Sequence, residues 1–161
     1  WTRLGYAYNH SGRYEQAIDT YERALALEPD RPGFVRNVTS AVMNRGAQLQ
    51  QEGDYDGARA MYMRARTLYP LNWQALNNLA WLLVTIPDES FRDKERALTL
   101  ARKAVELKRS PIFLDTLAEA YYSNGLTDEA IKTIKEAISL ADDRVDYYEK
   151  QLEKFLGGMN S

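Results

Sequence analysis

Small and large apolar residues recur along the chain at the spacing of helix faces. A small residue stands three positions before a large apolar one at four places: Gly5 and Tyr8, Gly46 and Leu49, Ala80 and Leu83, Ala118 and Tyr121. Further apolar residues follow each place at three- and four-residue steps, as at Ala17, Tyr21 and Ala24. This periodicity predicts amphipathic helices, and its fourfold recurrence predicts repeats of two helices each.

Glycine and proline punctuate the pattern where helices should end. Gly12, Gly53 and Gly125 separate the two helices of three repeats, and glycine readily takes the left-handed conformation that closes a helix. Pro29 and Pro70 close the first two repeats, because proline does not continue a helix interior.

Two intervals are longer than the repeat requires. Ala97 follows Ala80 by 17 residues where the other repeats have 12, so we expect an insertion of five residues in the turn around 87–92. Seven extra residues precede the second repeat, where Phe34 and Val38 continue the apolar stripe. These seven residues predict a first helix that is two turns longer, beginning near Pro32.

The chain ends with a helix that has one apolar face. Val145, Tyr148, Leu152 and Phe155 fall on that face, which suits a helix that covers the bare end of a stack of repeats. The predicted fold is all-α, one domain over residues 1–161. We place the repeats at 1–31, 39–72, 73–110 and 111–142 and the capping helix at 143–156.

The first repeat carries a recognisable signature. Trp1, Leu4, Gly5 and Tyr8, followed by Ala17, Tyr21, Ala24 and Pro29, resemble the tetratricopeptide repeat (TPR) family almost position for position. The other repeats keep part of the signature, with Val42 and Arg45 as departures in the second repeat, Arg109 in the third and Asp142 in the fourth. The resemblance implies a right-handed superhelical solenoid of helix-turn-helix repeats.

The third and fourth repeats resemble bacterial members of that family, in the stretches 77–83 and 114–118. In such proteins these repeats often belong to a longer chain, sometimes beside a membrane-embedded enzyme. The first helix begins inside the repeat pattern at Trp1, without an opening turn or a cap. We therefore expect an excerpt of a longer chain, with further repeats upstream.

The first helices of stacked repeats line the inner wall of a solenoid, and this wall is the candidate site. Polar and aromatic residues that face away from the expected core make up this wall. The predicted peptide-binding residues are Arg3, Tyr6, Asn9, Asn44, Gln51, Gln74, Asn77, Asn78, Trp81, Asp115, Glu119 and Tyr122.

Asn44 and Asn78 occupy equivalent places in consecutive repeats. An amide both donates and accepts, so a ladder of asparagines suits the backbone of an extended peptide, with Tyr6, Trp81 and Tyr122 as apolar anchors. The alternatives are that asparagine is merely tolerated on an exposed face, and that Trp81 packs between repeats.

Charge along this wall is uneven. Arg3 and His10 lie at one end and Asp115 and Glu119 at the other, which favours a ligand with a basic segment near the fourth repeat. The alternative is a solvated pair of carboxylates. The clamp by which family members hold a C-terminal carboxylate is mostly missing, because Thr2, Tyr6, Gln74 and Asn78 stand where other residues are required.

Composition excludes several functions. A net charge of −2 favours neither nucleic acid nor an anionic membrane surface, and we expect no membrane insertion. One histidine and no cysteine leave no nucleophile–base pair or zinc site, so we predict no enzyme, no metal and no cofactor. We predict a scaffold that binds a protein or peptide. One alternative is a module for self-association or repeat stacking, in which the open first repeat or the elongated helix around Phe34 packs on another copy or on upstream repeats. The other is a regulatory segment of a larger enzyme.

Overall fold

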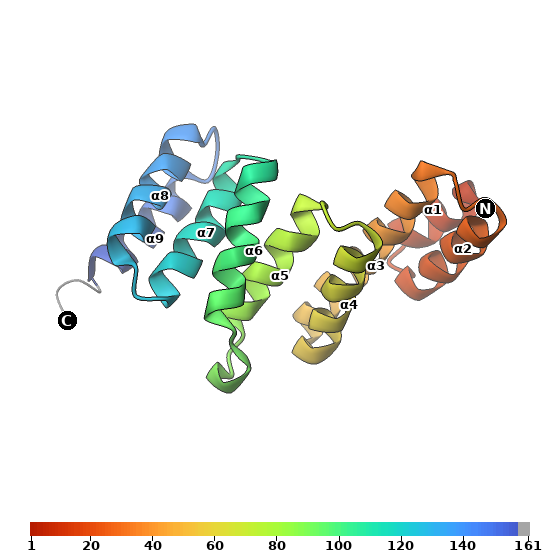
Figure 1. Ribbon diagram of the computed structural model, residues 1–161, viewed down its shortest axis with the longest axis horizontal. Helices are drawn as coiled ribbons and strands as arrows, with labels where there is room; N and C mark the ends of the chain where they lie inside the picture. The colour runs from red at the N-terminus through yellow and green to blue at the C-terminus, as the bar shows by residue number, and fades with distance from the viewer. Residues whose placement is uncertain (158–161) are drawn as a thin grey trace. The chain divides into compact units, whose positions relative to one another are not determined.

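The computed structural model describes residues 1–157, apart from the side chain of Pro32, and all regular structure in this part is helical (Figure 1). Nine α-helices and one 3-10 helix follow one another along these residues. Their bounds are α1 Thr2–His10, α2 Tyr14–Leu27, α3 Pro32–Glu52, α4 Tyr55–Leu68, α5 Trp73–Thr85, η1 Glu89–Phe91, α6 Lys94–Leu107, α7 Pro111–Ser123, α8 Thr127–Leu140 and α9 Val145–Gly157.

The predicted helices and turns are confirmed. Helix α3 has 21 residues, which matches the expected two-turn extension, and the insertion in the third repeat forms η1. Gly12, Gly53 and Gly125 have φ between 75° and 83°, the left-handed region that glycine adopts without steric cost. Each of the four repeats thus has two helices, joined by a short turn in the first, second and fourth repeats and by a longer segment containing η1 in the third.

The chain divides into two compact units, with the boundary between Ala75 and Leu76 in the first turn of α5. The single continuous domain predicted over 1–161 stays a prediction, and residues 158–161 lie outside the described part.

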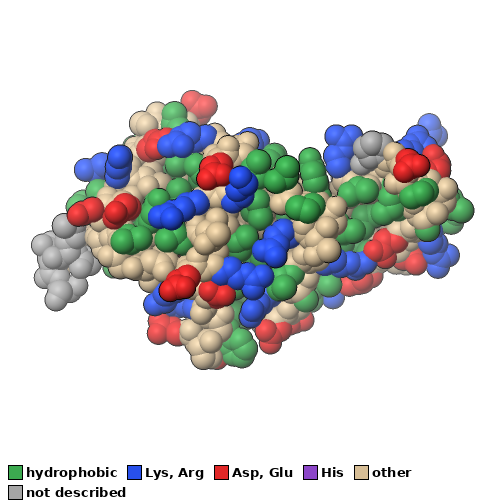
Figure 2. Space-filling model, viewed as in Figure 1, with side chains coloured by type: hydrophobic (Ala, Val, Ile, Leu, Met, Phe, Trp, Pro, Cys, Tyr) green, Lys and Arg blue, Asp and Glu red, His purple; other side chains and the backbone are tan. Residues whose placement is uncertain are grey.

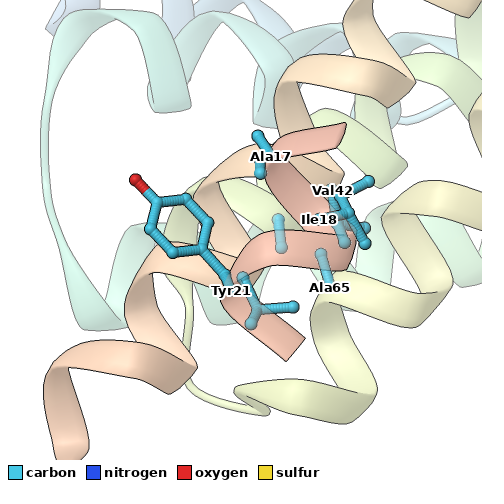
Figure 3. Packing of buried hydrophobic residues seen from close by; sticks show 8 residues of the cluster. Ala17, Ile18, Tyr21, Val42 and Ala65 are labelled. Atoms are coloured by element: carbon cyan, nitrogen blue, oxygen red, sulfur yellow. The ribbon is translucent and has the colours of Figure 1, made fainter. Parts of the chain in front are cut away.

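The first unit is built on a cluster of small and medium apolar side chains. Ala17 and Ile18 of α2 lie with Val42 of α3 and Ala65 of α4, and Tyr21 flanks them (Figure 3). Alanine at the points of contact lets helix axes approach closely, so the sequence positions that repeat as small residues are those where helices meet.

Two of these contacts are too close for any side chain larger than hydrogen. A Cβ placed on Gly46 would lie 2.8 Å from Cε1 of Tyr62, and one on Gly5 would lie 2.5 Å from Cε1 of Tyr21. The tyrosine ring follows the glycine by sixteen positions in each repeat. Glycine is therefore required here because an aromatic ring of the next helix occupies the space of its side chain.

Phe34 has a different environment from the one we expected. We considered it as part of a surface on which a second copy of the chain packs. It is only 4% exposed, and the guanidinium of Arg31 lies over its ring, with Cζ 5.1 Å from the ring centroid. Phe34 therefore belongs to the core and offers no surface for self-association.

The second unit ends with the predicted capping helix. Helix α8 packs against α7, and α9 packs against α8. Tyr148 and Phe155 of α9 are fully buried, as the apolar face of this helix predicted. Arg109, before α7, forms two hydrogen bonds to the carboxylate of Glu136 on α8, at 2.5 and 2.7 Å.

Basic and acidic side chains are interspersed over the face shown in Figure 2, in keeping with the small net charge. Among the described helices, none has both the length and the apolar character that crossing a membrane demands.

Candidate functional site

Two asparagines of the predicted wall meet in the first unit. The side-chain Nδ2 of Asn44 on α3 donates a hydrogen bond to Oδ1 of Asn9 on α1, at 3.0 Å. Both residues are partly exposed. The faces of two successive first helices are thus joined by their amides.

A hollow of about 400 Å³ lies beside Asn44. It is formed by one face of α3 and by the segment that leads from α4 into α5. Its lining residues are Arg36, Ser40, Met43, Asn44, Tyr69, Asn72, Trp73 and Gln74. Asn44 and Gln74, which we predicted as binding residues, therefore share one site.

The sequence prediction missed the residues that the connection before α5 contributes. We treated Pro70 only as the end of a repeat, yet Tyr69 and Asn72 beside it line the hollow. Oδ1 of Asn72 accepts the backbone N–H of Ala75 at 2.9 Å and so caps α5. An asparagine just before an apolar run is a known signal for a helix start, and it could have located this side of the site.

The remaining predicted residues of the first unit are exposed but lie outside the hollow. Arg3 and Tyr6 project from α1, and Gln51 lies near the end of α3. The ring of Tyr6 stacks on that of His10 with centroids 3.7 Å apart, and Nδ1 of His10 is 3.0 Å from the Tyr6 carbonyl oxygen.

In the second unit, Asn78 and Trp81 of α5 are partly exposed, as a binding role requires. Asn77 differs from the prediction, because its side chain is buried rather than on the open face. Its Oδ1 has no hydrogen-bond partner among the described residues. Successive side chains of an α-helix point about 100° apart, so the side chain of Asn77 faces the core while that of Asn78 stays partly exposed.

The expected exposure of Asp115 and Glu119 is wrong. Both carboxylates on α7 are buried. Oδ2 of Asp115 accepts a hydrogen bond from the Tyr147 hydroxyl at 3.1 Å, and both oxygens of Glu119 accept from Nζ of Lys154, at 2.7 and 2.8 Å. Tyr147 and Lys154 belong to α9, so the capping helix covers the acidic end of the predicted wall and neutralises part of its charge.

Burial changes the acidity of Asp115. It raises the pKa of this carboxyl to about 6, although the Tyr147 hydroxyl that donates to it acts in the opposite direction. Oδ1 of Asp115 has no partner among the residues described. The pKa of Tyr147 is also raised, first by burial and then by the charge of Asp115.

Tyr122 on α7 remains partly exposed at the edge of α9. Its ring is tilted against that of Phe155 with centroids 4.8 Å apart, and Nζ of Lys154 lies 5.5 Å from its centroid. Tyr122 is therefore held in place by the capping helix, while part of its ring stays open to a ligand.

Comparison with protein families gives a consistent result along the chain. Three tetratricopeptide repeat models match residues 1–31, 45–110 and 113–144. Together they cover most of the chain and all four helix pairs in part or whole.

A curated relative is photosystem I assembly protein Ycf3 of Prochlorococcus marinus. It is 32% identical over 85 residues, which are 48% of this chain and 48% of that protein. The protein of the same name from Cuscuta gronovii is 30% identical over 89 residues, 51% of this chain and 52% of that protein. The chain thus spans about half the length of the curated relatives it matches.

Two solved structures share the fold at low identity. The first TPR of Spaghetti (RPAP3), bound to HSP90 peptide SRMEEVD, has a TM-score of 0.64 at 19% identity, covering 76% of this chain and 94% of that one. The MamA RS-1 ArsTM double mutant has a TM-score of 0.68 at 17% identity, covering 96% and 80%. With the family matches and the observed helix pairs, they lead to one conclusion: the chain belongs to the tetratricopeptide repeat family.

Proposed function

We propose that this protein binds an extended peptide of a partner protein, along the exposed faces of α1 and α3, the first helices of the repeats in the first unit. As a member of the tetratricopeptide repeat family, the chain is a scaffold for protein–protein interaction rather than an enzyme. The observation that carries the proposal is the hollow beside Asn44, whose side-chain amide is hydrogen-bonded to that of Asn9.

The amides suit a peptide backbone. The bond between Asn44 and Asn9 uses one donor and one acceptor, and among the described residues no hydrogen bond uses Oδ1 of Asn44 or Nδ2 of Asn9. One acceptor on Asn44 and one donor group on Asn9 are thus left without a partner among those residues, and a peptide unit offers both a donor and an acceptor. Main-chain recognition of this kind holds an extended segment whatever its side chains are.

The hollow supplies a place for a side chain of the peptide. Met43, Tyr69 and Trp73 give it apolar surface, and Ser40, Asn72 and Gln74 give it polar groups. Its volume of about 400 Å³ falls within the usual range of ligand pockets, roughly 300–1,000 Å³. Large aromatic residues carry much of the binding energy at such sites, so we assign Trp73 and Tyr69 as anchors.

The comparisons support a scaffold without naming its ligand. One structural neighbour is bound to an HSP90 peptide, and a relative of similar sequence is an assembly protein. We do not extend the chaperone ligand to this chain, because Thr2, Tyr6, Gln74 and Asn78 replace the residues of the expected clamp. The regulatory role in a larger enzyme stays a prediction.

A selected peptide tests the proposal. A random twelve-residue library displayed on phage is selected against the folded protein, and the best peptide is labelled with fluorescein for anisotropy titration. We expect Asn9→Ala with Asn44→Ala, which removes both amides of the pair in the first unit, to weaken binding about five- to tenfold, the effect of losing one or two hydrogen bonds. Thr67→Ala on the exposed side of α4 is the matched control and should leave the affinity unchanged.

Circular dichroism and the urea midpoint of each variant show whether the helices stay folded. Equal affinity of the wild type and the double variant, with both folded, would refute binding through the amides. Failure to select any peptide would refute the proposed function.

A further inference from the structure

A second hollow, of about 670 Å³, lies in the second unit beside the inserted turn of the third repeat. The ends of α5 and α7, the starts of α6 and α8, and α9 surround it. Three basic side chains line it, Arg92, Lys94 and Lys154, together with a single carboxylate, Glu119. The insertion was predicted from the sequence, but without a role.

The carboxylate in this hollow is already neutralised. Both oxygens of Glu119 accept hydrogen bonds from Nζ of Lys154, at 2.7 and 2.8 Å. Glu119 is buried and Lys154 is about half exposed, so the pair contributes no net charge to a ligand that enters. The other two basic groups of the lining are Arg92, which forms an ion pair with Glu89, and Lys94.

The inserted turn holds Arg92 at the rim. Its Nε donates to the carbonyl oxygen of Ile86 at 2.8 Å, and one terminal nitrogen contacts Glu89 at 2.9 Å. The Glu89 side chain is 79% exposed and does not line the hollow, so its ion pair with Arg92 is weak and a carboxylate inside the hollow competes with it for the guanidinium. The guanidinium is therefore fixed in position before any ligand arrives.

Lys94 is the first residue of α6 and is exposed, and no ion pair or hydrogen bond of its ammonium group occurs within the described part. The acidic neighbours of Lys94 do not line the hollow. Asp93 is occupied as the cap of α6, where it accepts the backbone N–H of Arg96 at 3.1 Å. Hydroxyl groups of Ser123 and Thr127 complete the polar lining and donate to an acceptor as readily as they accept.

We propose that this hollow binds a carboxylate of an acidic peptide segment, with Arg92 and Lys94 as the groups that recognise it. A guanidinium and an ammonium group lining one hollow, with hydroxyl donors beside them, match the charge and the acceptors of a carboxylate. The inference rests on the proposed function, because it names the chemistry of the peptide. From the sequence we expect a ligand with a basic segment near the fourth repeat. The hollow instead favours an acidic segment.

Three synthetic peptides test the inference. They share a glycine–serine frame and a fluorescein label, and differ only in a central run of three glutamates, three glutamines or three lysines. We expect the glutamate peptide to bind the intact chain about tenfold more tightly than the glutamine peptide in about 50 mM salt, and to lose most of this advantage in about 500 mM salt. The lysine peptide should bind most weakly.

Substitutions locate the effect. Lys94→Glu should weaken binding of the glutamate peptide about tenfold, since it places a like charge beside the ligand. Lys135→Glu, an exposed position on α8, changes the net charge equally and should alter the affinity less than about twofold, because screening by salt weakens distant charges. Glu119→Gln frees Lys154 from its carboxylate and should strengthen binding about threefold.

Equal binding of the glutamate and glutamine peptides, or equal loss in Lys94→Glu and Lys135→Glu, would overturn the inference. In either case the peptide selected from the phage library would still bind, so failure here is distinct from failure of the proposed function. Peptides with a free or an amidated C-terminus show whether the carboxylate is that of a side chain or of a chain end, and both outcomes support the site.

Discussion

The fit between Gly46 and Tyr62 shows how single residues set the distance between helices. The ring of Tyr62 is buried against the glycine, and its hydroxyl donates to Oε1 of Gln50 at 3.2 Å. In the fourth repeat the corresponding positions hold Ala118 and Ile134, so a larger residue replaces the glycine and a smaller one replaces the tyrosine. Total volume is thus roughly conserved while the pair changes.

We predict that Gly46→Ala lowers the free energy of unfolding by about 1–3 kcal/mol, because the added methyl group clashes with a buried ring. Adding Tyr62→Ile, to copy the fourth repeat, should recover part of the loss. Gly33→Ala in the same helix meets nothing within 4 Å and should be neutral or stabilising by up to about 1 kcal/mol. Urea unfolding measures all three. A Gly46→Ala variant as stable as the wild type would show that the helices can shift apart freely.

Asp115 predicts a dependence of stability on pH. Its pKa is raised from 3.8 to about 6 in the folded chain, so the native state binds the proton more tightly than the unfolded state. The stabilising effect of this proton is complete below about pH 4 and is lost as the pH rises through about 6. The shift of about two pKa units corresponds to at most about 3 kcal/mol.

Asp115→Asn removes this titration while keeping an oxygen that accepts from Tyr147. We expect the variant to gain stability relative to the wild type as the pH rises from about 4 to about 7.5, by up to about 3 kcal/mol in urea unfolding. A difference between the two proteins that is constant over this range would contradict the raised pKa of Asp115.

Helix α9 shows what an element contributes beyond its own pattern. Its apolar face predicted a cap from sequence, and Phe155 is fully buried, as that role requires. The contacts of Tyr147 with Asp115 and of Lys154 with Glu119 were not predicted. They join residues 32 and 35 positions apart, on helices whose relative rotation no local pattern specifies.

Phe155→Ala should lower the free energy of unfolding by about 3–5 kcal/mol, since it leaves a cavity under the cap. The next residue is the control: Leu156 is 42% exposed, and Leu156→Ala should change stability by less than about 0.5 kcal/mol. Urea unfolding compares the two variants. Equal effects of the two substitutions would mean that α9 does not form part of the core.

The sequence predicts most of the helices and only part of the site. Helix spacing, turn glycines and the long α3 depend on neighbours within a few positions, and these predictions are confirmed. Residues that line a hollow depend on connections such as that from Tyr69 to Asn72, whose course no periodicity describes. Asn44 and Gln74 were found because they lie on helix faces, and Asn72 was missed because it lies on a turn.

The two compact units should respond separately to destabilising substitutions. In a chain of helical repeats each helix interacts mainly with its neighbours in sequence, so local losses of stability stay local. We expect Phe155→Ala to speed amide hydrogen exchange in α7, α8 and α9 and to leave α1–α4 unchanged, and Gly46→Ala to do the reverse. Exchange that rises uniformly along the chain would instead indicate a single cooperative unit.

Peptide binding by the first-helix faces is most directly tested by nuclear magnetic resonance. The side-chain NH2 groups of asparagine and glutamine give their own signals, so the selected peptide can be titrated into labelled protein and read at each amide. We predict that the side-chain signals of Asn9, Asn44 and Gln74 shift on saturation, while the backbone amide signals of the exposed faces of α2 and α4 do not. Backbone amide shifts confined to α2, α4, α6 and α8, with the signals of these three side chains unchanged, would contradict the proposed binding surface.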